Sequence, residues 1–185
     1  MIKIKTKKKE IIFSTSKLAV NQNLKDINLK KIIKFDISVT LIKNIDNNII
    51  TLVSSDIIWF SEKLNDEIKN KLYLLFGINT ENILLSATHT HGSLQTDTEF
   101  KFGEYDEKFN QTILDNIINI IYELSDLDYS EVSLSLGTLP IKKLSVNRRL
   151  FTYTFKIKEP FKRSQNRPNK SKKITNNLYS LTFKS

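Results

Sequence analysis

The order of the repeating patterns along residues 35–88 is the feature that most constrains how this chain can fold. Residues 35–42 alternate apolar and polar side chains, as a half-buried strand does, and 49–54 resume as a buried strand after a turn. Apolar residues at helical spacing then run up to Gly77, and residues 83–88 return as a strand. Because a strand that returns after a helix requires a crossover, the pattern predicts an α/β fold with a mixed β-sheet and helices packed against it.

The same kind of evidence extends the fold along the rest of the chain. Ser61 is expected to cap the first helix, whose apolar positions are Leu64, Ile68, Leu72 and Leu75. A second amphipathic helix is predicted over 106–125. Further strands are predicted at 10–14, 131–139, 151–157 and 178–183, with loops over 92–105 and 158–177. A chain of 185 residues can bury one core, so a single domain over residues 1–185 is expected.

Composition narrows the chemistry and the location. The chain has no cysteine, so a disulfide framework, a cysteine-based zinc site and a thiol nucleophile are all excluded. The basic N-terminus is followed by too short an apolar run for a signal peptide, and no uncharged run is long enough to span a membrane. The protein is therefore expected to be cytoplasmic, without a transmembrane segment.

The net charge of +9 is unevenly distributed. Residues 1–43 carry 11 basic and 3 acidic side chains, residues 44–140 carry 5 and 16, and residues 141–185 carry 13 and 1. The acidic middle suits a cation better than a phosphate backbone. The basic ends allow an alternative function, a non-enzymatic module that binds nucleic acid or an anionic membrane surface.

The only two histidines of the chain, His89 and His91, follow the 83–88 strand in the acidic middle. In extended backbone, side chains at positions i and i+2 point to the same face. Two imidazoles on one face at the end of a strand can bind a metal or share proton transfer. A solvent-exposed pair at the start of a loop is the competing interpretation.

Two motifs in order resemble a known family. Residues 86–91 read Ser-Ala-Thr-His-Thr-His, which is similar to the Ala-Thr-His-Thr-His-Ser-Gly-Pro signature of the neutral/alkaline non-lysosomal ceramidases. That family has a Ser-x-Asn-Arg-Ser element after a further helix and strand, and residues 145–149 read Ser-Val-Asn-Arg-Arg here. The resemblance runs roughly from residue 35 to residue 183, over an N-terminal portion of the family's catalytic domain.

The resemblance implies zinc-dependent hydrolysis of the amide bond of N-acylsphingosine or a related N-acyl lipid. It implies that His89 ligates the zinc ion (Zn2+) and that His91 hydrogen-bonds the nucleophile or the developing oxyanion. It also implies that Arg148 stabilises negative charge and that Asn147 positions the substrate. The partner implied is a ceramide-like lipid amide, and no nucleic acid is expected.

Two departures from the family pattern affect the expected activity. The Ser-Gly-Pro of the signature is Gly92-Ser93-Leu94 here, and the family's further zinc ligands, a third His, a Glu and a Tyr, have no matching positions. A catalytic zinc takes three protein ligands and a water. We therefore expect a truncated or incomplete site, with poor catalysis alone. The missing ligands would come from a C-terminal segment or a second chain, or in part from His91 and the acidic loop over residues 97–106.

Each assignment has a simpler counterpart. His89 can be a strand-end histidine, Arg148 a surface cation and Asn147 a turn former. Asp56, which follows the 49–54 strand, can be a site residue or a loop cap. A barrel amidohydrolase is disfavoured because it needs about 200 residues or more of regular strand–helix repeats.

Overall fold

The computed structural model of the chain describes residues 2–15, 31–99, 104–140, 147–156, 159–169 and 177–184. Residues 1–132 and residues 133–184 form two compact units. The prediction of a single domain over residues 1–185 is not tested by this division and stays a prediction.

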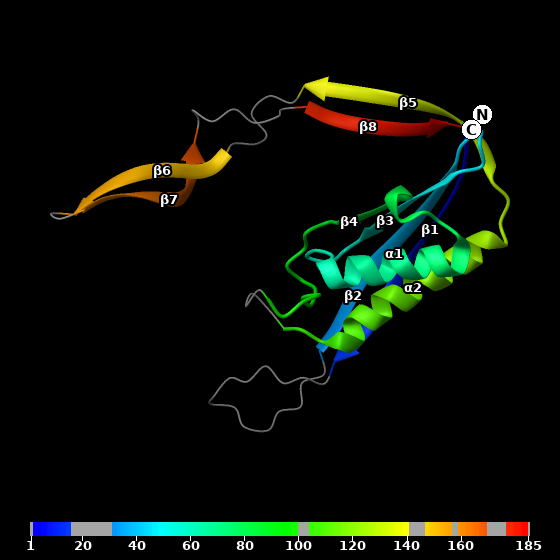
Figure 1. Cartoon of the computed structure of the whole chain (residues 1–185), viewed down its shortest axis with the longest axis horizontal. Helices are drawn as coiled ribbons and strands as arrows, with labels where there is room; N and C mark the ends of the chain where they lie inside the picture. The colour runs from blue at the N-terminus through cyan, green and yellow to red at the C-terminus, as the bar shows by residue number, and fades with distance from the viewer. Residues whose placement is uncertain are drawn as a thin grey trace. The chain divides into compact units, whose positions relative to one another are not determined.

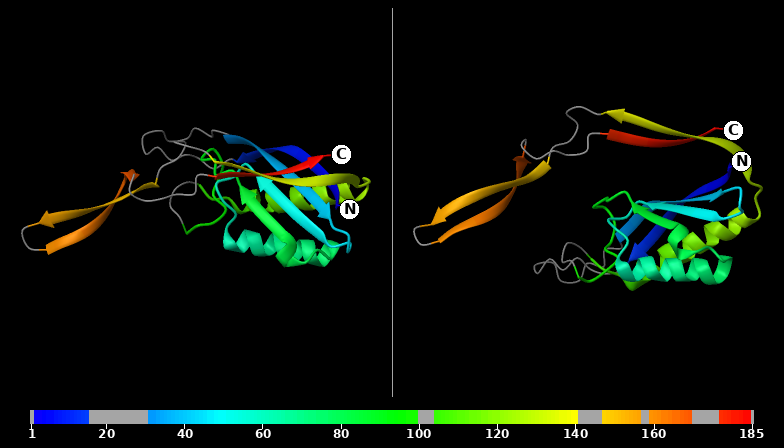
Figure 2. Two further views of the ribbon diagram at one scale, coloured as in Figure 1. Left: turned by 90° about the horizontal axis from the view of Figure 1, so that it is seen from above. Right: turned by 45° about the horizontal axis from the view of Figure 1, so that its top comes forward.

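The first unit is a mixed sheet with two helices on one of its faces (Figure 1, Figure 2). Its strand order is β4-β3-β2-β1, after which residues 130–132 of β5 pair with β1. Strands β1, β2 and β3 are antiparallel, whereas β4 lies parallel to β3. Its elements are β1 (Ile2–Thr15), β2 (Lys31–Lys43), β3 (Ile49–Ser55), α1 (Glu62–Phe76), the 3-10 turn η1 (Thr80–Asn82), β4 (Ile83–Ala87), α2 (Glu107–Ser125) and the start of β5 (Ser130–Pro140). The predicted mixed sheet with packed helices is confirmed, although strands dominate the fold and make α/β a coarse description.

The two helices begin and end where the sequence predicts. The Ser61 side chain accepts a hydrogen bond from the Leu64 N–H at the start of α1, and Gly77 ends α1 with φ 66°. Asp106 caps α2 through the N–H of Lys108. One predicted core position is wrong, because Leu75 is 47% exposed while Leu64, Ile68 and Leu72 of the same helix are fully buried.

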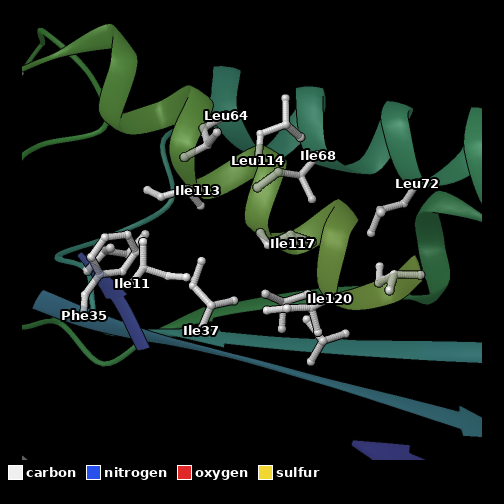
Figure 3. Packing of buried hydrophobic residues seen from close by; sticks show 14 of the residues in the cluster. Ile11, Phe35, Ile37, Leu64, Ile68, Leu72, Ile113, Leu114, Ile117 and Ile120 are labelled. Carbon is white, nitrogen blue, oxygen red and sulfur yellow. The ribbon is translucent and has the colours of Figure 1, made fainter. Parts of the chain in front are cut away.

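The core lies between these helices and the inward face of the sheet (Figure 3). The predicted amphipathic helix α2 buries its apolar face, and Phe109 on that face makes edge-to-face contacts with Phe13 and Phe35 at 5.3 and 5.2 Å between ring centroids. The cluster also includes Ile57 and Leu94, which lie in loops rather than in the helices or strands. The core therefore extends under the segments that surround the histidines.

The second unit consists of two antiparallel strand pairs. Residues 133–140 of β5 pair with β8 (Asn177–Lys184), and β6 (Asn147–Lys156) pairs with β7 (Glu159–Asn169). The predicted strands near 131–139, 151–157 and 178–183 are confirmed.

Two predictions about the ends of the chain are wrong. The N-terminal strand is not a short one over 10–14 but covers Ile2–Thr15, because it pairs with β2 from Lys3 to Thr15. Its lysines stay at the surface, where Lys7 and Lys9 lie near Glu123 of α2. The predicted loop over 158–177 contains β7, which includes Pro160 and Pro168. Prolines are tolerated there because each strand of a two-stranded ribbon is an edge strand. The predicted 92–105 loop is confirmed for its described residues, apart from one isolated bridge between Gln95 and Tyr105.

None of the helices in the described ranges is long and apolar enough to cross a membrane.

Two leucines of α1 offer a matched test of this packing. Leu72 is fully buried and Leu74 is 74% exposed. We predict that Leu72→Ala lowers the free energy of unfolding by about 2–5 kcal/mol, because it opens a cavity in the core. Leu74→Ala should change it by less than about 0.5 kcal/mol. Urea denaturation of both variants measures this, and equal losses would contradict the placement of α1.

Candidate functional site

The site candidates lie where the parallel pair β3 and β4 ends. The carboxyl ends of parallel strands meet at the same edge of a sheet, and Asp56 follows β3 while His89 follows β4 by two residues. Hydrogen bonding continues past the ladder, from Thr88 N–H to Ser55 O at 3.0 Å and from His89 N–H to Ile57 O at 3.1 Å. The backbone of His89 is therefore fixed against the segment that leaves β3.

The ring of His89 is fixed against the same segment. Its Nδ1 lies 2.8 Å from the carbonyl oxygen of Ile58. Because a carbonyl oxygen can only accept, Nδ1 must carry the proton, and in the neutral ring Nε2 then carries the lone pair. A carbonyl that takes one ring N–H and leaves the other nitrogen as a ligand is the usual arrangement around metal-binding histidines.

His89 also has an uncommon backbone conformation, with φ 61°. Among the non-glycine residues of the described ranges, only Asn47 shares a positive φ, and Asn47 lies in the hairpin turn. A left-handed residue that is not glycine costs roughly 1–2 kcal/mol and persists only where its surroundings fix it. The hydrogen bonds to Ile57 and Ile58 provide that constraint.

His91 lies beside His89, although not because the two residues alternate along an extended strand. Strand β4 ends at Ala87 rather than at residue 88, and the left-handed His89 breaks the extended backbone on which the alternation argument rested. The two rings nevertheless meet edge to face, with centroids 5.4 Å apart and planes at 89°. Both side chains are exposed, so ligands and solvent can reach them.

The segment over residues 93–97 is tied to the segment over 57–61 by side-chain hydrogen bonds. Thr96 is 2% exposed and Ser61 is 5% exposed, so the two bonds between these residues are shielded from water. The bonds between the two segments are Ile58 N–H to Ser93 Oγ at 3.1 Å, Thr96 Oγ1 to Trp59 O at 2.9 Å, Ser61 N–H to Thr96 Oγ1 at 3.0 Å, Ser61 Oγ to Thr96 O at 2.8 Å and Trp59 Nε1 to Asp97 Oδ2 at 2.8 Å. The loop that carries His91 is thereby attached to the start of α1.

Asp56 has structural contacts at the same sheet edge. Its N–H donates to Asp36 O at 3.0 Å, and its Oδ2 accepts a longer bond of 3.4 Å from Asp36 N–H. The Nζ of Lys8 lies 2.5 Å from Oδ2 of Asp36. Hydrogen bonding and electrostatic attraction to the Asp36 carboxylate raise the pKa of Lys8, and Asp56 adds a smaller attraction. These contacts match the interpretation of Asp56 as a residue that fixes the loop after β3.

The described residues contain no group of three or more His, Asp or Glu side chains that could hold a metal ion together. In the acidic loop over 97–106, Asp97 accepts from Trp59 and Asp106 caps α2, while residues 100–103 lie outside the description. His89 is thus the residue whose local geometry best suits a ligand, and it would need partners.

Asn147 and Arg148 are in the second unit, at the start of β6. Their side chains lie outside the described part of the chain, so their predicted roles stay predictions. The pairing of β6 with β7 is irregular between Asn147 and Arg149, at the position of Arg148.

Sequence reasoning missed the groups that orient His89. The carbonyls of Ile57 and Ile58 leave no trace in a sequence because every residue has one. In the sequence, Ser93 stands out only as part of the departure from the family signature. Its hydrogen bond to Ile58 depends on the tertiary meeting of two loops.

Comparisons with known proteins identify the fold. No family model matches the chain, and no curated protein matches it in sequence. Among solved structures, a neutral ceramidase from Pseudomonas aeruginosa matches with a TM-score of 0.61 at 18% identity, over 80% of this chain and 25% of that one. A ceramidase complexed with C2 matches with a TM-score of 0.60 at 17% identity, over 80% of this chain and 24% of that one. The chain thus spans about a quarter of their length, and the predicted resemblance is confirmed at the level of the fold.

The left-handed backbone of His89 predicts an inverted response to glycine. The free energy of unfolding of His89→Gly should be about 0.5–1 kcal/mol higher than that of His89→Ala, because a positive φ strains the backbone of alanine but not that of glycine. At His91, which is not among the residues with positive φ, glycine should instead be less stable than alanine. Denaturant unfolding of the four variants measures both differences. The same order at both positions would contradict the conformation of His89.

Proposed function

We propose that this chain is a ceramidase-like, zinc-dependent amidohydrolase domain acting on the amide bond of N-acylsphingosine or a related N-acyl lipid. The observation that carries the proposal is the His89 ring, which donates through Nδ1 to Ile58 O at the end of the parallel strands of a fold shared with neutral ceramidases. The bound zinc, the lipid amide substrate and the hydrolytic activity are all part of this proposal.

His89 fits a zinc ligand by its chemistry. Ile58 O fixes the proton on Nδ1, so Nε2 offers its lone pair to a cation. The surrounding segment 44–140 carries 5 basic and 16 acidic residues, which favours a cation. When bound, zinc supplies a water of lowered pKa and polarises the amide carbonyl.

The other residues have roles that follow from their chemistry. His91, whose ring lies against that of His89, would hydrogen-bond the water or the oxygen on which negative charge develops. Arg148 is a permanent cation that would stabilise the same charge. Asn147 would orient the amide of the substrate through its own side-chain amide.

The proposed site is incomplete within the described residues. Three protein ligands are usual for a catalytic zinc, and the described ranges offer no group of three. The solved ceramidases are about four times as long as the part that this chain matches. We propose that the remaining ligands come from a further segment or a second chain, and that this chain alone binds zinc weakly and hydrolyses ceramide poorly.

Zinc binding tests the proposal directly. We predict that the purified protein binds zinc in equilibrium dialysis and that His89→Ala weakens binding. The weakening should exceed the roughly 10–100-fold cost of losing a ligand's hydrogen-bond partner. His91→Ala, the matched control, should weaken binding less, because His91 is proposed to contact the water rather than the metal. Equal and negligible zinc in wild type and His89→Ala would remove the metal from the proposal.

A further inference from the structure

Ser93 forms two hydrogen bonds that give its hydroxyl a defined direction. The hydroxyl donates to the carbonyl oxygen of Leu94 at 3.1 Å, and the same oxygen lies 3.1 Å from the N–H of Ile58. A serine has one hydroxyl proton, so with that proton on Leu94 the oxygen acts as an acceptor toward Ile58.

These bonds continue in series to His89. The peptide group whose N–H reaches Ser93 has Ile57 O at its other end, and that oxygen accepts the backbone N–H of His89 at 3.1 Å. Ile58 O, which belongs to the following peptide group, accepts the ring Nδ1–H of His89 at 2.8 Å. Loss of the Ser93 bond therefore weakens the bond to the backbone N–H of His89 by polarisation, and it reaches the ring bond by letting the Ile58 backbone shift.

Burial makes the position of Ser93 consequential. Ile57 is fully buried, Ile58 is 7% exposed and Leu94 is 1% exposed, so the two segments that Ser93 joins are anchored in the core. Removing the hydroxyl would leave the Ile58 N–H without this acceptor. A donor without a partner in such surroundings is costly, and the segment would shift to find another.

We infer that Ser93 is a positioning residue that sets the ring tautomer and orientation of His89 by holding the backbone of Ile58, whose carbonyl accepts the ring N–H. Ser93 does not touch the proposed metal position itself. This positioning role rests on the proposed function, because it matters only if His89 binds a metal. The tautomer of His89 can nevertheless be measured without zinc.

Nuclear magnetic resonance can read the tautomer directly. The chain has only two histidines, so a His91→Gln background leaves the His89 ring as the one imidazole signal. At about pH 8, where a free imidazole is neutral, long-range proton–nitrogen correlations distinguish the two tautomers. We expect one Nδ1–H form in the wild-type sequence and in Ser93→Thr, which keeps the hydroxyl. In Ser93→Ala we expect a mixture with a substantial Nε2–H population.

Thr96→Val is the control for a merely structural effect. Thr96 also accepts from a backbone N–H, that of Ser61, and donates to Trp59 O, but it makes no bond to the Ile57–Ile58 peptide. Its loss should lower the melting temperature and leave the His89 tautomer unchanged. If Ser93→Ala does not fold, Ser93→Cys, with a weak sulfur acceptor, takes its place with the same expectation.

The outcomes separate the positioning role from the proposed function. An unchanged Nδ1–H tautomer in Ser93→Ala, or an equal tautomer change in Thr96→Val, would overturn the inference. A tautomer change together with a zinc affinity about 10–100-fold lower supports both. A tautomer change in a protein that never binds zinc supports the role of Ser93 and removes the metal from the proposed function.

Discussion

The geometry of the site depends on the hydrogen bonds by which the Ile57–Ile58 segment fixes His89. One carbonyl takes the backbone N–H and the next takes the ring N–H, at 3.1 and 2.8 Å. Together they fix a backbone conformation that costs energy and decide which ring nitrogen offers a lone pair. Without them the histidine pair would be two exposed imidazoles after a strand, which is the simpler interpretation that the sequence also allows.

The fold supplies these carbonyls because of how the core is built. Helix α1 crosses over between β3 and β4 and makes them parallel, so the chain segments that leave both strands lie at one edge of the sheet. Ile57 and Leu94 belong to the same buried cluster as the helices, although they lie in the loops. The stability of the core therefore extends to the segments around His89, and the neighbouring bonds of Thr96 and Ser61 attach the second loop to the start of α1.

Sequence patterns predicted what depends on local periodicity. The hairpin, both helices and the returning strand follow from apolar spacing and caps, and the order of the Thr-His-Thr-His and Asn-Arg motifs led to the fold family. The left-handed His89 could not be predicted, because distant carbonyls rather than local preference impose it. The full length of β1 was missed since it depends on long-range pairing with β2, and β7 was missed because prolines are read as breaks.

The identity of the nitrogen that meets the metal tests this account most directly. Diffraction at the zinc absorption edge from zinc-soaked crystals locates the ion relative to the His89 ring. The account predicts an anomalous peak at Nε2, with Nδ1 still within hydrogen-bonding distance of Ile58 O. A peak at Nδ1, a ring turned away from Ile58, or zinc bound only elsewhere on the chain would contradict it.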